Sequence, residues 1–208
     1  MANADTPFGL RPLRHLNGNP WNGQTQKCLI EDSYGTALFI GDPVIITGTA
    51  GDDDSGTGKH PVINRFTAGA TYRIYGVITS FELIDCAGGV HTEVYNPAST
   101  KRYANVCIDP DVVFLVQDDA GATLDGDSVG ANAVLSTSTA GSTATGLSGV
   151  ELAAATTPAA DATYQVLILA VHDSPDNEIG AHCLWEVLIS NHVLRGGGAA
   201  SNQGFLGI

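Results

Sequence analysis

The sequence predicts an all-β protein, either a jelly-roll-like sandwich or a β-barrel, with extended N- and C-terminal arms. Short segments of strand length alternate with turn signals along the chain, roughly eight to ten of them. Evidence for helices is thin, because the best candidate, residues 150–155, is closed at once by Thr156, Thr157 and Pro158. With 208 residues, of which 43% are hydrophobic and 15% charged, the chain can bury a core and is not disordered in composition.

The central strand signals lie in three segments. Residues 71–84 are rich in aromatic and β-branched residues, and Gly76 within them predicts a bulge. Residues 102–108 and 112–117 are of strand length and are separated by Asp109-Pro110-Asp111, which predicts a turn or bend. All three segments therefore predict strands.

The clearest strand pair comprises residues 164–172 and 183–190. In the second segment the residues alternate, so that one face carries Cys183, Trp185, Val187 and Ile189 and the other carries Glu186, Ser190 and His192. Between the two segments, residues 174–177 read Ser-Pro-Asp-Asn, which is typical of a type I turn. The pattern predicts two neighbouring strands with one buried face.

The two ends of the chain differ from this body, which is predicted to span residues 28–195. Residues 1–27 are rich in Pro, Gly and Asn, which prevents a helix, and predict an extended arm with apolar residues that need a surface to cover. Residues 196–208 begin with three glycines and end in a short apolar tip, which predicts a flexible arm. The residues expected to contact a neighbouring subunit are Phe8, Leu10, Arg11, Leu13, Arg14, Trp21, Phe205, Leu206 and Ile208.

Charge is the unusual feature of the composition. The chain has 9 Lys and Arg against 22 Asp and Glu, a net charge of −13. No Lys or Arg occurs between Arg102 and Arg195. Because such a surface is repelled by phosphate backbones, nucleic acid is not expected as a partner. The start of the chain has no apolar run typical of a signal peptide, and no stretch is apolar enough to span a membrane, so a membrane partner is not expected either.

The four cysteines are widely spaced and form no CxxC pair, which favours buried free thiols over a disulfide framework. No cofactor is expected. Aspartates in turns leave one candidate calcium site, formed by Asp118, Asp119, Asp125 and Asp127, against the simpler interpretation as turn residues. His172 and His182 with Asp173 or Glu178 form a second, weaker zinc candidate.

Catalytic signals in the sequence are weak. Residues 126–130 (Gly-Asp-Ser-Val-Gly) match the Gly-x-Ser-x-Gly pattern, but no strand-to-helix turn is predicted there to expose the serine. Cys183 beside His182 lies within a predicted strand, where neighbours point to opposite faces. We therefore expect no enzymatic activity. Four aromatic residues are candidates for a carbohydrate platform, although packing under the arms and at subunit contacts is the favoured interpretation. They are Trp21, Tyr34, Tyr95 and Tyr103.

Three regions of the sequence carry motifs that point to one group of proteins. The first is the opening TPFGLRP of residues 6–12, followed by RHLNG at residues 14–18. The second is LDGDSVGAN at residues 124–132 with TGLSGVEL at residues 145–152. The third is DNEIG at residues 176–180, leading to WEVLISNH at residues 185–192. In these regions the chain resembles a group of tailed-bacteriophage virion proteins, the capsid decoration or cement family.

The resemblance implies an all-β protein that decorates the outer capsid surface and bridges neighbouring major capsid protein subunits. It implies synthesis in the host bacterial cytoplasm, self-association as a dimer or trimer, and no catalytic residue. A clamp across subunit joints opposes opening of the shell, and symmetry repeats its effect many times. Extended arms suit such a clamp, since they can bury apolar residues on a neighbour.

Two alternatives remain open at this point. The first is a glycan-binding or host-attachment component of the virion head or tail that uses exposed aromatic residues and a Ca²⁺ site. The second is a hydrolase built on a β-barrel, which a polar pocket would reveal.

Overall fold

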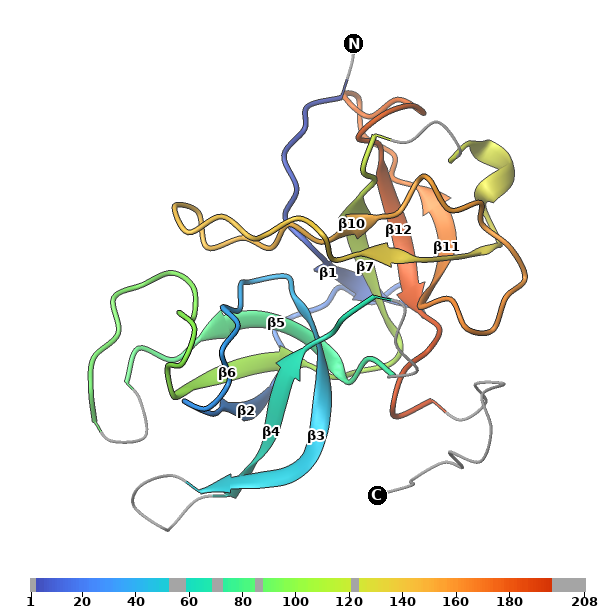
Figure 1. Cartoon of the computed structure of the whole chain (residues 1–208). Helices are drawn as coiled ribbons and strands as arrows, with labels where there is room; N and C mark the ends of the chain where they lie inside the picture. The colour runs from blue at the N-terminus through green and yellow to red at the C-terminus, as the bar shows by residue number, and fades with distance from the viewer. Residues whose placement is uncertain (1–2, 53–58, 69–72, 85–87, 121–123, 196–208) are drawn as a thin grey trace.

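The computed structural model describes residues 3–52, 59–68, 73–84, 88–120 and 124–195, and these form an all-β protein (Figure 1). The strands make a closed barrel and a separate five-stranded sheet. Within the described ranges there is no α-helix, and the one helical element is the short 3₁₀ turn η1 (Gly126–Ser128). The prediction of an all-β fold is confirmed.

The barrel is built by the first half of the chain. Its strands follow one another around the barrel as β2 (Gln26–Ile30), β4 (Lys59–Arg65), β3 (Pro43–Asp52), β5 (Gly76–Phe81) and β6 (Arg102–Cys107). The pairing of β2 with β4 is parallel, and the other pairs are antiparallel. Apolar side chains such as Ile30, Val44, Ile63, Ile78 and Val106 fill its interior.

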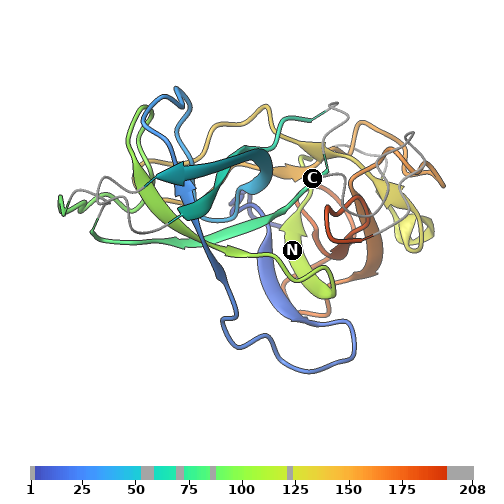
Figure 2. The ribbon, with the colours of Figure 1, turned by 90° about the horizontal axis from the view of Figure 1, so that it is seen from below.

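The sheet is antiparallel throughout and belongs mainly to the second half of the chain. Its order is β1 (Arg11–His15), β7 (Val112–Gln117), β12 (Leu184–Ile189), β11 (Val166–Val171) and β8 (Asn132–Ala133). The short pair β9 (Leu135–Ser136) and β10 (Glu151–Leu152) lies beside it. Figure 2 shows the barrel and the sheet next to each other, with β1 between them.

The predicted strand pair is present as β11 and β12, which pair antiparallel. Cys183, Trp185, Val187 and Ile189 are all buried in the sheet core, as the alternation predicts. The type I turn is supported by the hydrogen bond from the Asn177 N–H to the Ser174 carbonyl, at 3.0 Å. His192 departs from the pattern: it is buried, because the chain after β12 turns back to bridge with Ile74.

Two local predictions are wrong for identifiable reasons. The helix candidate at residues 150–155 contains β10 instead, because Val150, Leu152 and Ala154 alternate and are all buried. The bulge predicted at Gly76 lies between Ile78 and Ser80. Gly76 is needed for another reason, since a Cβ there would lie 2.4 Å from the Cys107 carbonyl oxygen.

The N-terminal segment is not a free arm ending at residue 27. Residues 11–15 form β1, the edge strand of the sheet, and β2 already begins at Gln26. Leu10 is 1% exposed and lies in this chain's own core, which corrects its prediction as a contact to a neighbour. The reason is a close backbone crossing: Gly9 has a φ of +73°, and the Leu10 N–H donates to the Gly41 carbonyl at 2.9 Å.

The C-terminal arm with its candidate contacts Phe205, Leu206 and Ile208 lies outside the described residues, as does Cys86. Cys28, Cys107 and Cys183 are buried and free, as predicted. Burial raises the pKa of these thiols, to about 12 for Cys28 and about 11 for the other two. They therefore stay protonated and unreactive at neutral pH.

Candidate functional site

The most prominent exposed apolar surface of the described residues lies on the connection between β5 and β6. Four of its side chains are largely in solvent: Leu83 at 66%, Ile84 at 59%, Val90 at 74% and Val94 at 49% exposure. We call this set the apolar loop; the described parts of its connection are the green segments that project from the side of the barrel in Figure 1. Exposed apolar side chains are common singly, but a group on one projecting segment is typical of an interaction surface.

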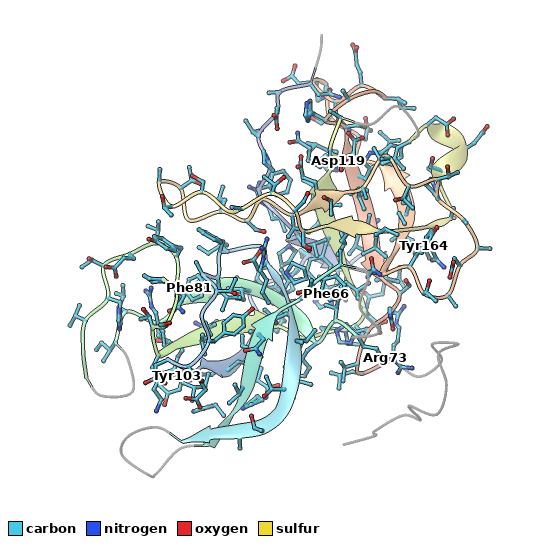
Figure 3. The ribbon with its side chains drawn as sticks, in the orientation of Figure 1. Phe66, Arg73, Phe81, Tyr103, Asp119 and Tyr164 are labelled. Carbon is cyan, nitrogen blue, oxygen red and sulfur yellow. The ribbon has the colours of Figure 1, made fainter. Side chains whose placement is uncertain are left out.

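The base of the apolar loop is held by the buried side chain of Arg102. This residue is 1% exposed, and its Nε donates to the Glu82 carbonyl at 2.7 Å. Its Nη1 donates to the carbonyls of Glu93 and Tyr95, at 3.1 and 2.8 Å. The two ends of the loop are thus tied to one guanidinium group, which also lies 5.3 Å from the centre of the Phe81 ring. Phe81 is labelled in Figure 3.

Burial lowers the pKa of Arg102, and the charge of Glu93 opposes that shift. A guanidinium group nevertheless remains charged inside proteins, so its hydrogen bonds are charge-assisted and stronger than neutral ones.

A second set of contacts fixes the end of the loop at Tyr95 and Asn96. The backbones of Leu38 and Asn96 exchange two hydrogen bonds, at 2.9 and 2.8 Å. The rings of Phe39 and Tyr95 stack with their centres 5.2 Å apart. Gly146, from the connection between β9 and β10, approaches so closely that a Cβ there would lie 2.5 Å from the Val94 carbonyl oxygen. The apolar loop is therefore presented by a packed junction rather than by a loose segment.

The predicted N-terminal contact residues have a different arrangement. Phe8, Leu10, Arg11 and Trp21 come together around one shallow hollow that also reaches Ile78 of the barrel. The Arg11 guanidinium lies 4.4 Å from the centre of the Phe8 ring, and Arg11 itself is exposed. Leu13 is half-buried on β1. These side chains line a join between the barrel and the sheet instead of extending away from the protein.

Arg14, predicted to contact a neighbouring subunit, instead pairs within the sheet. Its Nη2 lies 2.8 Å from Glu186 Oε2, and His172 Nδ1 lies 3.1 Å from Glu186 Oε1. Burial would raise the pKa of Glu186, but the hydrogen bonds from His172 and Arg14 outweigh it and lower that pKa. Among the described residues His182 gathers with other possible metal ligands but not with His172, so the predicted zinc pair of these two histidines is wrong.

Three of the four aspartates of the calcium candidate have side chains that serve local structure. Asp118 accepts hydrogen bonds from the His182 N–H at 2.7 Å and from Trp185 Nε1 at 2.9 Å. Asp119 accepts one from the Ala154 N–H at 2.8 Å. Asp125 caps η1 through the N–H of Asp127 and the hydroxyl of Ser128. Among the described residues they do not gather as metal ligands, and a different group does: Asp5, Glu151 and His182.

The aromatic candidates for a carbohydrate platform are each buried or half-buried against their own chain. Tyr34 accepts a hydrogen bond from the Arg65 N–H at 3.0 Å, and Tyr95 stacks on Phe39. Tyr103 lies under the Lys27 ammonium, 4.8 Å from the ring centre. Trp21 packs against the sheet core. Their contacts are those of packing residues.

The sequence reasoning missed the apolar loop and its anchor. Leu83 and Ile84 were assigned to the strand predicted at residues 71–84, whereas β5 ends at Phe81. One signal in the sequence could have indicated an exposed apolar surface. Val90 and Val94 recur among Gly, His, Thr and Glu in a segment where no strand is predicted to bury them. Nothing local marks Arg102 as an anchor, because its partners lie on other segments.

Searches against protein-family models, curated proteins and solved structures each find no match to this chain. In the described part of the chain, no helix has the length and apolar character needed to cross a bilayer.

Proposed function

We propose that this chain is a structural virion protein that decorates a bacteriophage capsid from outside, and that the apolar loop binds the major capsid protein. The observation that carries the proposal is the loop itself: four large apolar side chains held in solvent on a fixed base. Fully burying a Leu, Ile or Val side chain contributes about 1.5–3 kcal/mol. For four side chains that are already partly covered, contact with a partner would supply roughly 4–7 kcal/mol before the costs of association.

The rigid base makes such a contact efficient. Loop ends that are already anchored lose little conformational entropy on binding, so more of the apolar burial appears as affinity. Arg102 and the Leu38–Asn96 pairing provide this order in the free chain. The apolar loop, in place of the N-terminal arm predicted from the sequence, is therefore the proposed contact to the major capsid protein.

Charge favours the outside of the capsid and indicates the partner's chemistry. At −13 the chain is repelled by packaged DNA, which excludes the interior of a filled head as a favourable place. Glu93, whose side chain is 44% exposed, lies next to Val94 of the apolar loop, so the matching surface is an apolar depression with a basic residue at its rim. The resemblance to decoration proteins in the sequence supports the same role.

The glycan-binding alternative has no comparable support, because its aromatic residues are engaged in packing within the chain. Self-association as a dimer or trimer stays a prediction.

Binding to heads tests the proposal. Heads that lack this protein, purified from the phage that encodes it, are mixed with the wild-type chain or with Val90→Asp, and bound protein is measured by co-sedimentation. Because an aspartate would place an unpaired charge in an apolar contact, we expect at least about 30-fold weaker binding. The matched control is Ile179→Asp, at a 55%-exposed apolar residue on the turn between β11 and β12.

Wild-type binding with loss in Val90→Asp and retention in Ile179→Asp supports the proposal. Equal binding of both variants, or no wild-type binding to heads, contradicts it.

A further inference from the structure

The N-terminal segment, β10 and the turn before β12 each bring one ionisable side chain to the same place at the end of the sheet. We propose that Asp5, Glu151 and His182 form a binding site for a divalent transition-metal ion of the zinc type. One carboxylate oxygen from each acid and one ring nitrogen of His182 all lie within 4.8 Å of one another. The site adjoins Asp119, labelled in Figure 3, and is separate from the apolar loop and from the proposed capsid contact.

Two buried polar atoms of this group have no hydrogen-bond partner. Glu151 is 6% exposed, and its Oε1 is unpaired. His182 Nδ1 is also buried and unpaired, and it lies 3.7 Å from Asp5 Oδ1, too far for a hydrogen bond. Buried polar groups in proteins are nearly always satisfied, so unpaired buried atoms on two residues of one candidate ligand group indicate a missing binding partner.

The group is positioned by one buried amide on β7. Gln117 is 3% exposed, and its Nε2 donates to the carbonyls of Ala4 and His182, at 2.8 and 3.0 Å. Its Oε1 accepts from the Thr6 N–H at 3.0 Å. The residues on both sides of Asp5 and the backbone of His182 are thus held by a single side chain, which places two of the three ligands before any ion binds.

His182 is held in an uncommon backbone conformation. Its φ is +60°, in the left-handed region, and its N–H donates to Asp118 Oδ1 at 2.7 Å. Strained residues of this kind concentrate at ligand sites, where the surrounding structure fixes them. Here the hydrogen bond to Asp118 fixes the backbone from which the imidazole extends.

The surroundings select a cation over an anion. Burial, together with the negative charges of Asp5, Asp119 and Asp118, raises the pKa of Glu151 to about 7. An anion would meet the same repulsion, whereas a divalent cation would relieve it.

The ligand types select the class of cation. Ca²⁺ and Mg²⁺ prefer oxygen ligands, whereas zinc accepts imidazole nitrogen with carboxylate oxygens. Tetrahedral ligands around zinc lie about 3.4 Å apart, so the group must contract slightly. Asp5 can supply that movement because its side chain is 66% exposed. Three protein ligands leave the fourth position to water, and the bound ion would fasten the N-terminal segment to the sheet.

Metal titration tests the site. Calorimetry with Zn²⁺ and the visible absorption of bound Co²⁺ are measured on the full chain. The variants are Asp5→Asn, Glu151→Gln and His182→Asn, and asparagine is chosen at residue 182 because it tolerates the left-handed backbone. We expect one ion per wild-type chain and at least about tenfold weaker binding in each variant. The matched control is His15→Asn, which removes another half-buried histidine beside an acid, Asp109, at 3.3 Å.

Asp5→Asn keeps the test decisive if a buried variant fails to fold, because Asp5 is exposed. Absence of wild-type binding, or unchanged affinity in Asp5→Asn, would overturn the proposal. Weakened binding in Asp5→Asn with unchanged binding in His15→Asn supports it.

Discussion

Replacing Arg102 by methionine removes a buried guanidinium group while keeping a side chain of similar length. Three carbonyls, those of Glu82, Glu93 and Tyr95, then lose their donor. A hydrogen bond that involves a charged group contributes about 1.5–3 kcal/mol, and the lower part of that range applies because the guanidinium itself is desolvated. Water that reaches the freed carbonyls reduces this loss, whereas the lost contact to the Phe81 ring adds to it. We therefore expect the free energy of unfolding to fall by roughly 3–5 kcal/mol.

Urea unfolding and amide hydrogen exchange measure this effect together. Exchange should accelerate most at residues 88–96, because both ends of the apolar loop lose their anchor. Arg102→Lys should lose about half as much stability, since an ammonium keeps the charge but cannot reach all three carbonyls. The control is Arg73→Met, at a half-buried arginine before β5 (Figure 3). An Arg102→Met chain within about 0.5 kcal/mol of wild type, with unchanged exchange in the loop, would refute the anchoring role.

Two further predictions concern the N-terminal crossing and the acidic group. Gly9→Ala should lower the free energy of unfolding by about 2–4 kcal/mol in urea titration, because its Cβ would lie 2.4 Å from the Gly41 carbonyl oxygen at a φ of +73°. Gly23→Ala, with a φ of +90° but no atom within 4 Å of the added Cβ, should lose only about 1 kcal/mol, and equal losses would count against the crossing. Since the folded pKa of Glu151 is raised to about 7, its protonated form favours folding, and metal-free stability should fall by up to roughly 3 kcal/mol as pH rises from about 4.5 to 7. Glu151→Gln should flatten that part of the pH profile, and an identical slope in the variant would show that another group is responsible.

The strand content could be predicted because its signals are local. The alternation through Trp185 and Val187 needs only neighbouring residues, and it identified both β12 and its buried face. The turn at residues 174–177 was equally local. The pairing of strands depends on residues far apart in the sequence and has no local signal. The bend at Asp109-Pro110-Asp111 therefore did not reveal that it connects β6 of the barrel to β7 of the sheet.

The N-terminal segment shows how a correct local feature led to a wrong conclusion. Its prolines do exclude a helix, but an edge strand tolerates proline, and Pro12 pairs with Phe114 at the edge of the sheet. The covering surface that the apolar residues required was this chain's own sheet and barrel. The Asp5, Glu151 and His182 group was invisible for a related reason, since only the folded chain brings its members together.

The most direct test of the proposed role is a cryo-electron microscopy map of the virion that carries this protein. The account predicts density for the chain on the outside of the capsid, with Leu83 and Val90 buried against the major capsid protein. A map in which the chain is attached through another surface while this loop faces solvent, or in which the chain is not part of the head, would contradict it.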